Sequence, residues 1–116
     1  MVREFKEDIL GTEYTIKVSD DRKEIGLSDE NWGECHVYEK TILVCSKNEE
    51  GISDDANRTQ VAEILAHEVF HAYLNESGNT YALEPEVEEL MCAMFSKVWR
   101  KMFNTILDSL DSMGMV

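Results

Sequence analysis

Residues 67–71 read HEVFH, and this motif constrains the fold more than any other part of the chain. Because a helical turn holds about 3.6 residues, histidines four positions apart project from one face of a helix. His67 and His71 can then supply two ligands of a tetrahedral zinc site. Glu68 lies about 100° around the helix from His67, where it can take a proton from a metal-bound water. The chain must therefore form a helix here and supply a further ligand from elsewhere.

The residues around the motif predict a long helix that ends soon after it. Ser53, Asp54 and Asp55 are the candidates for the N-cap, and the acids suit the positive end of the helix dipole. We expect the helix to stop near Ser77, with Gly78 as the following residue that ends many helices in a left-handed conformation. The motif therefore lies past the middle of this helix.

Pro85 is well placed as the first residue of a second helix, because proline fits that position. Apolar residues then follow steps of three and four, as in an amphipathic helix. They are Trp99, Met102, Phe103, Ile106, Leu107, Leu110 and Met113. A helix of about 28 residues spans about 42 Å, which is longer than a core this small can cover. We expect its first half to pack within the chain, and residues 99–116 to form an amphipathic extension through which two chains pair as a homodimer.

The first third of the chain predicts strands. Residues 14–18 alternate and are rich in β-branched and aromatic side chains. Residues 34–38 and 41–45 flank a two-residue turn, which indicates a hairpin. Together with the two helices, these segments predict an α+β fold with a short antiparallel sheet of about three strands. The length favours a single domain over residues 1–116.

The third metal ligand is not fixed by the motif itself. In the metzincin pattern a glycine and a third histidine follow the motif, but Leu74 and Ser77 occupy those positions. The only other histidine is His36, on a predicted strand well before the motif. A carboxylate from the second helix is therefore the better candidate.

Four glutamates near the start of the second helix are available, and helical phase helps to choose among them. Glu88 borders the apolar face that should pack against the motif helix, so it is the first choice. Glu89 heads a face of small residues that could also approach another helix closely. Glu84 lies one turn before Glu88, at the start of the helix. Glu89 and Glu84 stay open as alternatives to Glu88.

Composition narrows the class of partner. The net charge is −13, from 24 acidic against 11 basic residues, and neutralising a nucleic-acid backbone needs Lys and Arg. We therefore expect no nucleic-acid partner. The chain has no apolar run of about 18 residues, so no membrane partner is expected either. A charged N-terminus without a signal-peptide pattern and three cysteines without a disulfide pattern favour a cytoplasmic protein.

The HEVFH motif, the residues up to Gly78, and the Glu88-Glu89 pair on a second helix resemble the zincin-like metallopeptidases. Within that group they are most similar to the small ImmA/IrrE-like proteins of phages and prophages, and the resemblance covers most of residues 9–98. It implies a gluzincin-type site with Zn²⁺ on His67, His71 and a downstream glutamate. Glu68 is then the general base.

These observations predict a zinc-dependent metallopeptidase that hydrolyses a peptide bond of a protein or peptide substrate. An edge strand, residues 41–45 or the strand paired with it, could hold an extended peptide by strand addition. The alternative is a non-catalytic zincin-like scaffold that acts as a phage or prophage interaction or anti-defence protein through its acidic surface. A third hypothesis is a DNA-mimic inhibitor, for which only the net charge of −13 argues.

Overall fold

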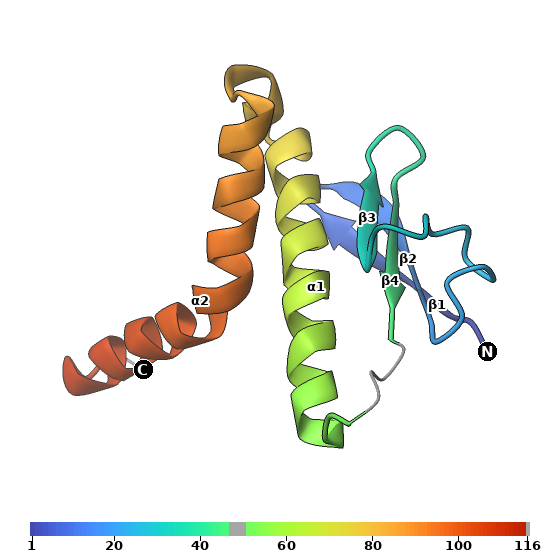
Figure 1. The fold of residues 1–116 in the computed structure, drawn as a ribbon. Coiled ribbons are helices and arrows are strands. Elements are labelled where there is room, and N and C mark those ends of the chain that lie inside the picture. The colour runs from blue at the N-terminus through green and yellow to red at the C-terminus, as the bar shows by residue number, and fades with distance from the viewer. Residues whose placement is uncertain (47–50, 116) are drawn as a thin grey trace.

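A computed structural model describes residues 1–46 and 51–115, and it has three layers: a sheet, a central helix and an outer helix (Figure 1). The strands are β1 (Arg3–Ile9), β2 (Thr12–Ser19), β3 (Gly33–His36) and β4 (Thr41–Cys45). The helices are α1 (Asp54–Glu76), the short 3₁₀ helix η1 (Asn79–Ala82) and α2 (Pro85–Ser112). The predicted α+β class is therefore confirmed.

The sheet is mixed, with strand order β1-β2-β4-β3. β1 pairs antiparallel with β2, and β3 pairs antiparallel with β4, but β2 and β4 run parallel. The prediction of a short antiparallel sheet of about three strands is thus wrong in both strand number and direction. The reason is the connection after β2, because residues 20–32 carry the chain to β3 at the sheet edge and the hairpin then returns it as β4 beside β2. The predicted hairpin is confirmed, but β3 ends at His36, which pairs with Thr41, so the turn covers residues 37–40 rather than two residues.

β1 is the strand that the sequence pattern missed. Six of its seven residues are exposed and only Ile9 is buried, so charged residues fall on both faces and hide the alternation. The strand forms because Leu10 and Gly11 both have positive φ angles, 51° and 89°, as a tight two-residue hairpin turn requires. Pairing with β2 along its whole length then supplies the backbone hydrogen bonds.

The sheet is buried most completely at β4, which is covered on both faces. The main core lies between the sheet and α1, where partly buried α1 side chains also pack. Its buried members are Ile9, Tyr14, Ile16, Ile42, Val44 and Ala72. On the other face, Ile25 and Leu27 of the segment between β2 and β3 pack against Leu43 and Cys45. This second cluster buries β4 on both sides, which fixes the hairpin and therefore the position of β3.

The predicted ends of α1 are confirmed. Ser53 is the N-cap, and its hydroxyl accepts a hydrogen bond from the backbone N–H of Ala56 at 3.1 Å. Ser77 ends the helix, and Gly78 follows with a φ of 83°. Such a glycine turns the chain at low steric cost. The chain then reverses through η1, so that α2 starts beside the C-terminal end of α1.

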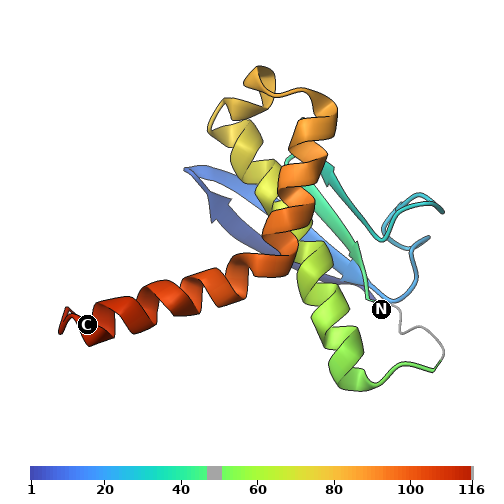
Figure 2. The ribbon, with the colours of Figure 1, turned by 60° about the vertical axis from the view of Figure 1, so that its left-hand side comes forward.

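α2 begins with Pro85 in its first turn and has 28 residues, as the sequence predicts. It packs on the side of α1 that faces away from the sheet, then bends partway along, and its C-terminal part leaves the body of the molecule (Figures 1 and 2). Cys92 and Ser96 are the buried residues of α2. Among the described residues, no helix has both the length and the apolar character needed to span a bilayer.

Candidate metal centre

The two histidines of the motif lie on the face of α1 that meets α2 and the sheet edge. Their ring centroids are 5.0 Å apart with an interplanar angle of 59°. The side chains are partly buried, with 23% of His67 and 14% of His71 exposed. One helical turn thus holds both imidazoles side by side at the rim of a cleft, as the spacing of the motif predicts.

Small residues bring α2 close to this part of α1. Cys92 and Ser96 are 0% and 7% exposed, and Phe95 beside them stacks on Phe70 of α1 with ring centroids 4.4 Å apart. Small side chains at a contact allow two helices to approach closely. The face that carries Cys92 and Ser96 therefore directs the residue one turn earlier, Glu89, at the histidines.

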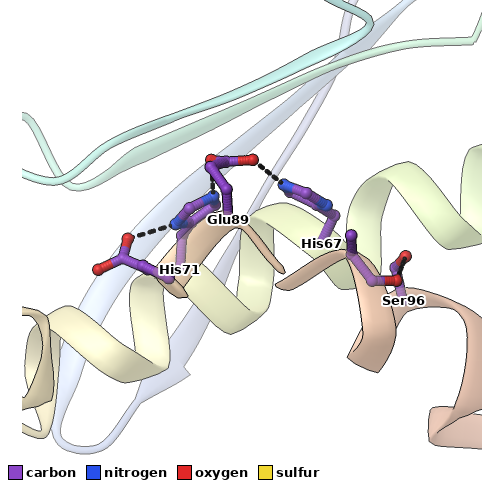
Figure 3. A network of polar contacts seen from close by, with 6 residues as sticks. His67, His71, Glu89 and Ser96 are labelled. Carbon is purple, nitrogen blue, oxygen red and sulfur yellow. Dashed lines mark hydrogen bonds and ion pairs between the residues drawn. The ribbon is translucent and has the colours of Figure 1, made fainter. Parts of the chain in front are cut away.

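The Glu89 carboxylate lies between the two imidazoles (Figure 3). One oxygen is 3.2 Å from His67 Nε2, and the other is 2.7 Å from His71 Nε2. Glu88 contacts only His71, with its carboxylate 2.6 Å from Nδ1. His71 is thus held on both ring nitrogens, by Glu89 on the side facing His67 and by Glu88 on the other side.

The charge state of His67 follows from its surroundings. Burial lowers the pKa of His67, the neighbouring His71 acts in the same direction, and Glu89 partly opposes both. A lower pKa keeps the imidazole neutral at physiological pH. Neutral imidazole is the form that binds a metal ion.

Glu68 is the buried carboxylate of the site. It is 8% exposed, and burial raises its pKa to about 7. The carboxylates of Glu89 and Glu34 act in the same direction, while His71 opposes them. In the described part of the chain, no side chain donates a hydrogen bond to Glu68. A carboxyl group of this kind can exchange a proton near neutral pH.

The edge strand β3 passes directly over Glu68. A Cβ atom at Gly33 would lie 2.6 Å from Ile64 Cγ2, 3.0 Å from Glu68 Cγ and 3.1 Å from Glu68 Oε2. Only glycine therefore lets the strand approach α1 this closely without a shift of the neighbouring atoms. The sequence holds no pattern that marks Gly33 as part of the site, because its role depends on a tertiary contact.

The site opens into a cleft of about 510 Å³ between β3, α1, η1 and α2. Its lining residues are Asn31, Gly33, Glu34, Cys35, His36, Val37, His67, Glu68, His71, Thr80, Glu88 and Glu89. Within it, Glu34 contacts His36 Nε2 at 3.0 Å. Although burial acts in the opposite direction, hydrogen bonds from Asn31, Ser28 and His36 hold the pKa of Glu34 at about 2. The Thr80 hydroxyl is buried without a partner among the described residues, so it is free to bond to a bound molecule.

Cys92 is a second potential third ligand. Ligand atoms of His67, His71 and Cys92 all lie within 4.8 Å of one another. Burial raises the pKa of the Cys92 thiol to about 12, with the nearby Glu88 and Glu89 acting in the same direction. Without a cation the thiol is thus protonated, and a metal would have to displace its proton to use it as a ligand.

The structure brings together every residue that the motif singles out. His67, Glu68, His71, Glu88 and Glu89 all line one cleft. Glu84 does not, because it is the exposed N-cap residue of α2. The choice of Glu88 as the third ligand stays a prediction, although Glu89 lies nearer to both Nε2 atoms. In the sequence, Glu89 was indicated by its spacing from Cys92 and Ser96, which places all three on one face of the helix. Cys92 and Ser96 are the small residues through which the two helices meet.

The second half of the chain matches a model of the DA1-like family, described as Protein DA1, over residues 57–113. The match covers 57 of 116 residues, just under half of the chain, and includes the HEVFH motif and both Glu88 and Glu89. No curated protein and no solved structure matches the chain. The C-terminal half is therefore similar to the DA1-like family.

This match corrects the family predicted from the motif. The matching model is neither that of the zincin-like metallopeptidases nor that of the ImmA/IrrE-like proteins, so this assignment and the phage association drawn from it are wrong. A five-residue motif defines the local geometry of two imidazoles and a carboxylate, which unrelated families can share. The second helix already differs from that group, because it lacks a clear E-x-x-A-[ND]-x-F-A pattern and has Met91, Cys92, Met94 and Phe95 at the core positions.

Proposed function

We propose that the chain is a zinc-dependent hydrolase of peptide bonds, with His67, His71 and Glu89 as metal ligands and Glu68 as general base. The observation that carries this proposal is the convergence of three donor groups. A carboxylate of α2 lies 3.2 Å and 2.7 Å from the two Nε2 atoms of α1. The two helices therefore bring two imidazoles and a carboxylate into contact in the cleft, with one carboxylate oxygen on each imidazole.

The donor set fits a divalent cation. Zinc lies about 2.0–2.2 Å from nitrogen and oxygen ligands, so the ligand atoms of a tetrahedral site are about 3.3 Å apart. The 3.2 Å contact of one carboxylate oxygen with His67 is close to this separation, and the 2.7 Å contact of the other oxygen with His71 is shorter. A bound ion would therefore have to move the Glu89 carboxylate slightly away from His71. Glu88 has the role of an orienting residue, because its carboxylate on Nδ1 fixes the ring of His71 and makes the other nitrogen a better ligand.

Glu68 supplies the acid–base chemistry. With a pKa of about 7, it can accept the proton of an attacking water and return it to the leaving amine. A bound zinc ion would lower the pKa of a water and polarise the scissile carbonyl. The substrate would be an extended peptide in the cleft, held along the free edge of β3 by backbone hydrogen bonds.

Metal binding tests the ligand set without any substrate. We expect one zinc ion per chain by elemental analysis, with an increase in thermal stability on adding zinc. Glu89→Gln should weaken zinc affinity by more than the 10–100-fold expected for the orienting residue in Glu88→Gln. The two variants remove the same charge from neighbouring positions, so each controls for the other. Absence of zinc binding by the wild-type chain would overturn the proposal.

Cobalt substitution separates a carboxylate from a thiolate as the third ligand. A thiolate bound to Co²⁺ gives an intense near-ultraviolet charge-transfer band, whereas nitrogen and oxygen ligands do not. We expect no such band, and the same visible spectrum in Cys92→Ser. A charge-transfer band that disappears in Cys92→Ser would replace Glu89 by Cys92 in the ligand set.

Catalysis is tested on the zinc-loaded protein with a mixture of extended peptides. We expect cleavage that a chelator removes and added zinc restores. Glu68→Gln should keep the zinc but lose the cleavage. A zinc-loaded wild-type chain that leaves every peptide intact, or equal cleavage by Glu68→Gln, would contradict the assignment of Glu68 as the general base.

A further inference from the structure

The C-terminal part of α2, residues 97–112, presents an apolar face that is exposed beyond its first turn. At its start Lys97 still pairs with Glu63 of α1 at 3.0 Å, and Trp99 lies beside Thr59 and Ala62 of α1. This distal segment leaves the body of the molecule (Figures 1 and 2). Every residue from 100 to 109 is exposed, including Phe103 at 57% and Ile106 at 51%. A contiguous exposed apolar face of this kind marks an interaction surface, because burying it is favourable.

The spacing of the apolar residues defines the kind of partner. Trp99, Phe103, Ile106, Leu110 and Met113 follow steps of four, three, four and three. This alternation is the seam of a two-stranded coiled coil, in which the partner is another helix with the same spacing. A second copy of the distal segment meets this requirement. Because the segment already continues a helix anchored on α1, little ordering is needed on association.

The charges of the distal segment select the direction of pairing. Its three basic residues, Lys97, Arg100 and Lys101, lie near the start, and its two acidic residues, Asp108 and Asp111, lie near the end. In a parallel pair, like charges would lie at the same level. An antiparallel pair sets basic residues level with acidic ones and also opposes the two helix dipoles.

The charge count also favours self-association at this place. The whole chain carries a net charge of −13, so two copies repel each other over most of their surfaces. The distal segment carries three basic and two acidic residues, and is therefore close to neutral. It is also the part of the chain that extends away from α1 and the sheet (Figure 2).

We propose that the chain forms a symmetric antiparallel dimer through the distal segment. The register that places Trp99 opposite Leu110 of the second copy also places Phe103 opposite Ile106 and sets Lys101 level with Asp108. The apolar residues define this register, and it maps onto itself as a twofold interface requires. Lys101 and Asp108 lie on the outer side of the helix, away from the seam, so these charges favour the antiparallel direction only at a distance. The proposal is independent of the function proposed for the cleft.

Sedimentation of the full chain tests the dimer. We expect twice the 13.3 kDa chain mass at high concentration, with dissociation on dilution. Phe103→Glu combined with Ile106→Glu should give the monomer mass at every concentration, with unchanged helix content by circular dichroism. Asn104→Glu adds a charge between the same positions but off the seam, and should leave the dimer intact. A wild-type monomer throughout the range would overturn the proposal.

Disulfide trapping tests the register with two single variants, Phe103→Cys and Ile106→Cys. In the antiparallel register each new cysteine faces the other position, so linked dimers should accumulate only when the two variants are mixed. A parallel pair would bring like positions together, and each variant would cross-link by itself. Cross-linking of the separate variants but not of the mixture would therefore overturn the antiparallel arrangement.

Discussion

Glu68 and Glu76 are two glutamates of α1, about two helical turns apart, in opposite environments. Glu76 accepts hydrogen bonds from Tyr14 at 2.8 Å, Lys40 at 2.8 Å and Asn75 at 2.9 Å. Lys40 makes the largest contribution, with Thr12, Tyr14 and Asn75 acting in the same direction, and together they lower the pKa of Glu76 to about 2 against the effect of burial. Glu68 is buried beside Gly33, and burial raises its pKa to about 7.

The difference separates a carboxylate that holds parts of the fold together from one that can exchange a proton. Glu76 joins the end of α1 to β2 and to the β3–β4 turn, and its charge is fixed at any physiological pH. Among residues 1–46 and 51–115, no such partner contacts Glu68, so its proton remains available at neutral pH. Substitutions at the two sites should therefore divide between activity and stability.

The largest expected effect is the loss of hydrolysis in Glu68→Gln. Removal of a general base lowers the rate by about 10²–10⁴-fold. The metal-free variant should be at least as stable as the wild type at pH 7, because burial penalises the ionised form of the carboxylate and the amide carries no charge. Kinetics with zinc-loaded protein and thermal unfolding of metal-free protein measure the two effects.

Glu76→Gln is the matched control for this prediction, since it makes the same chemical change on the same helix. It should leave the rate of the folded enzyme nearly unchanged and lower the stability instead. If Glu76→Gln abolished hydrolysis in folded, zinc-loaded protein, the division between the two glutamates would not hold.

The sequence predicts this comparison only in part. The helix, its caps and the positions of His67, Glu68 and His71 on it follow from local patterns, because they depend on residues within a few turns. The partners of Glu76 do not, since Tyr14 lies 62 residues away along the chain. The same holds for Glu89, whose position depends on how closely α2 approaches α1 through Cys92 and Ser96.

The strand pattern shows the same limit. Strands with one buried face were predictable from alternation, but β1 was not, because it is held by pairing and by its turn rather than by burial. The parallel pairing of β2 with β4 depends on the path of residues 20–32. Short-range patterns therefore identify elements and motif chemistry, whereas register and third ligands require the packed structure.

Gly33→Ala tests whether the close approach of β3 determines the environment of Glu68. The new methyl group would lie 2.6 Å from Ile64 Cγ2 and 3.0 Å from Glu68 Cγ, so β3 must move away from α1. Overpacking of this kind costs about 1–3 kcal/mol, and hydrolysis should fall because the base is displaced. Denaturant unfolding and kinetics measure the two changes.

Ile64→Ala supplies the control for the glycine, because it removes the atom in closest contact. The double variant Gly33→Ala with Ile64→Ala should be less destabilised than the sum of the single variants. Strict additivity would mean that the effect of Gly33→Ala does not arise from this contact.

The pH dependence of stability tests whether the ionised Glu76 carboxylate stabilises the fold. The folded pKa of about 2 lies below the ordinary glutamate value of 4.5, so the stabilisation by Glu76 is present above about pH 4.5 and is lost as the pH falls toward 2. Glu76→Gln should therefore lower the stability at pH 6 and flatten the acid limb of the curve. Glu84→Gln, at an exposed position, should leave the curve unchanged.

The smallest expected effect is that of Tyr14→Phe, which removes one of the three hydrogen bonds to Glu76. Tyr14 is fully buried. Burial is the largest cause of the raised pKa of its hydroxyl. The hydroxyl therefore stays protonated and donates the hydrogen bond. The phenylalanine ring keeps the packing, while Lys40 and Asn75 remain on the carboxylate. We expect a loss of about 1 kcal/mol in the free energy of unfolding, with hydrolysis unchanged. A loss as large as that of Glu76→Gln would mean that Tyr14, rather than Lys40, dominates the contact.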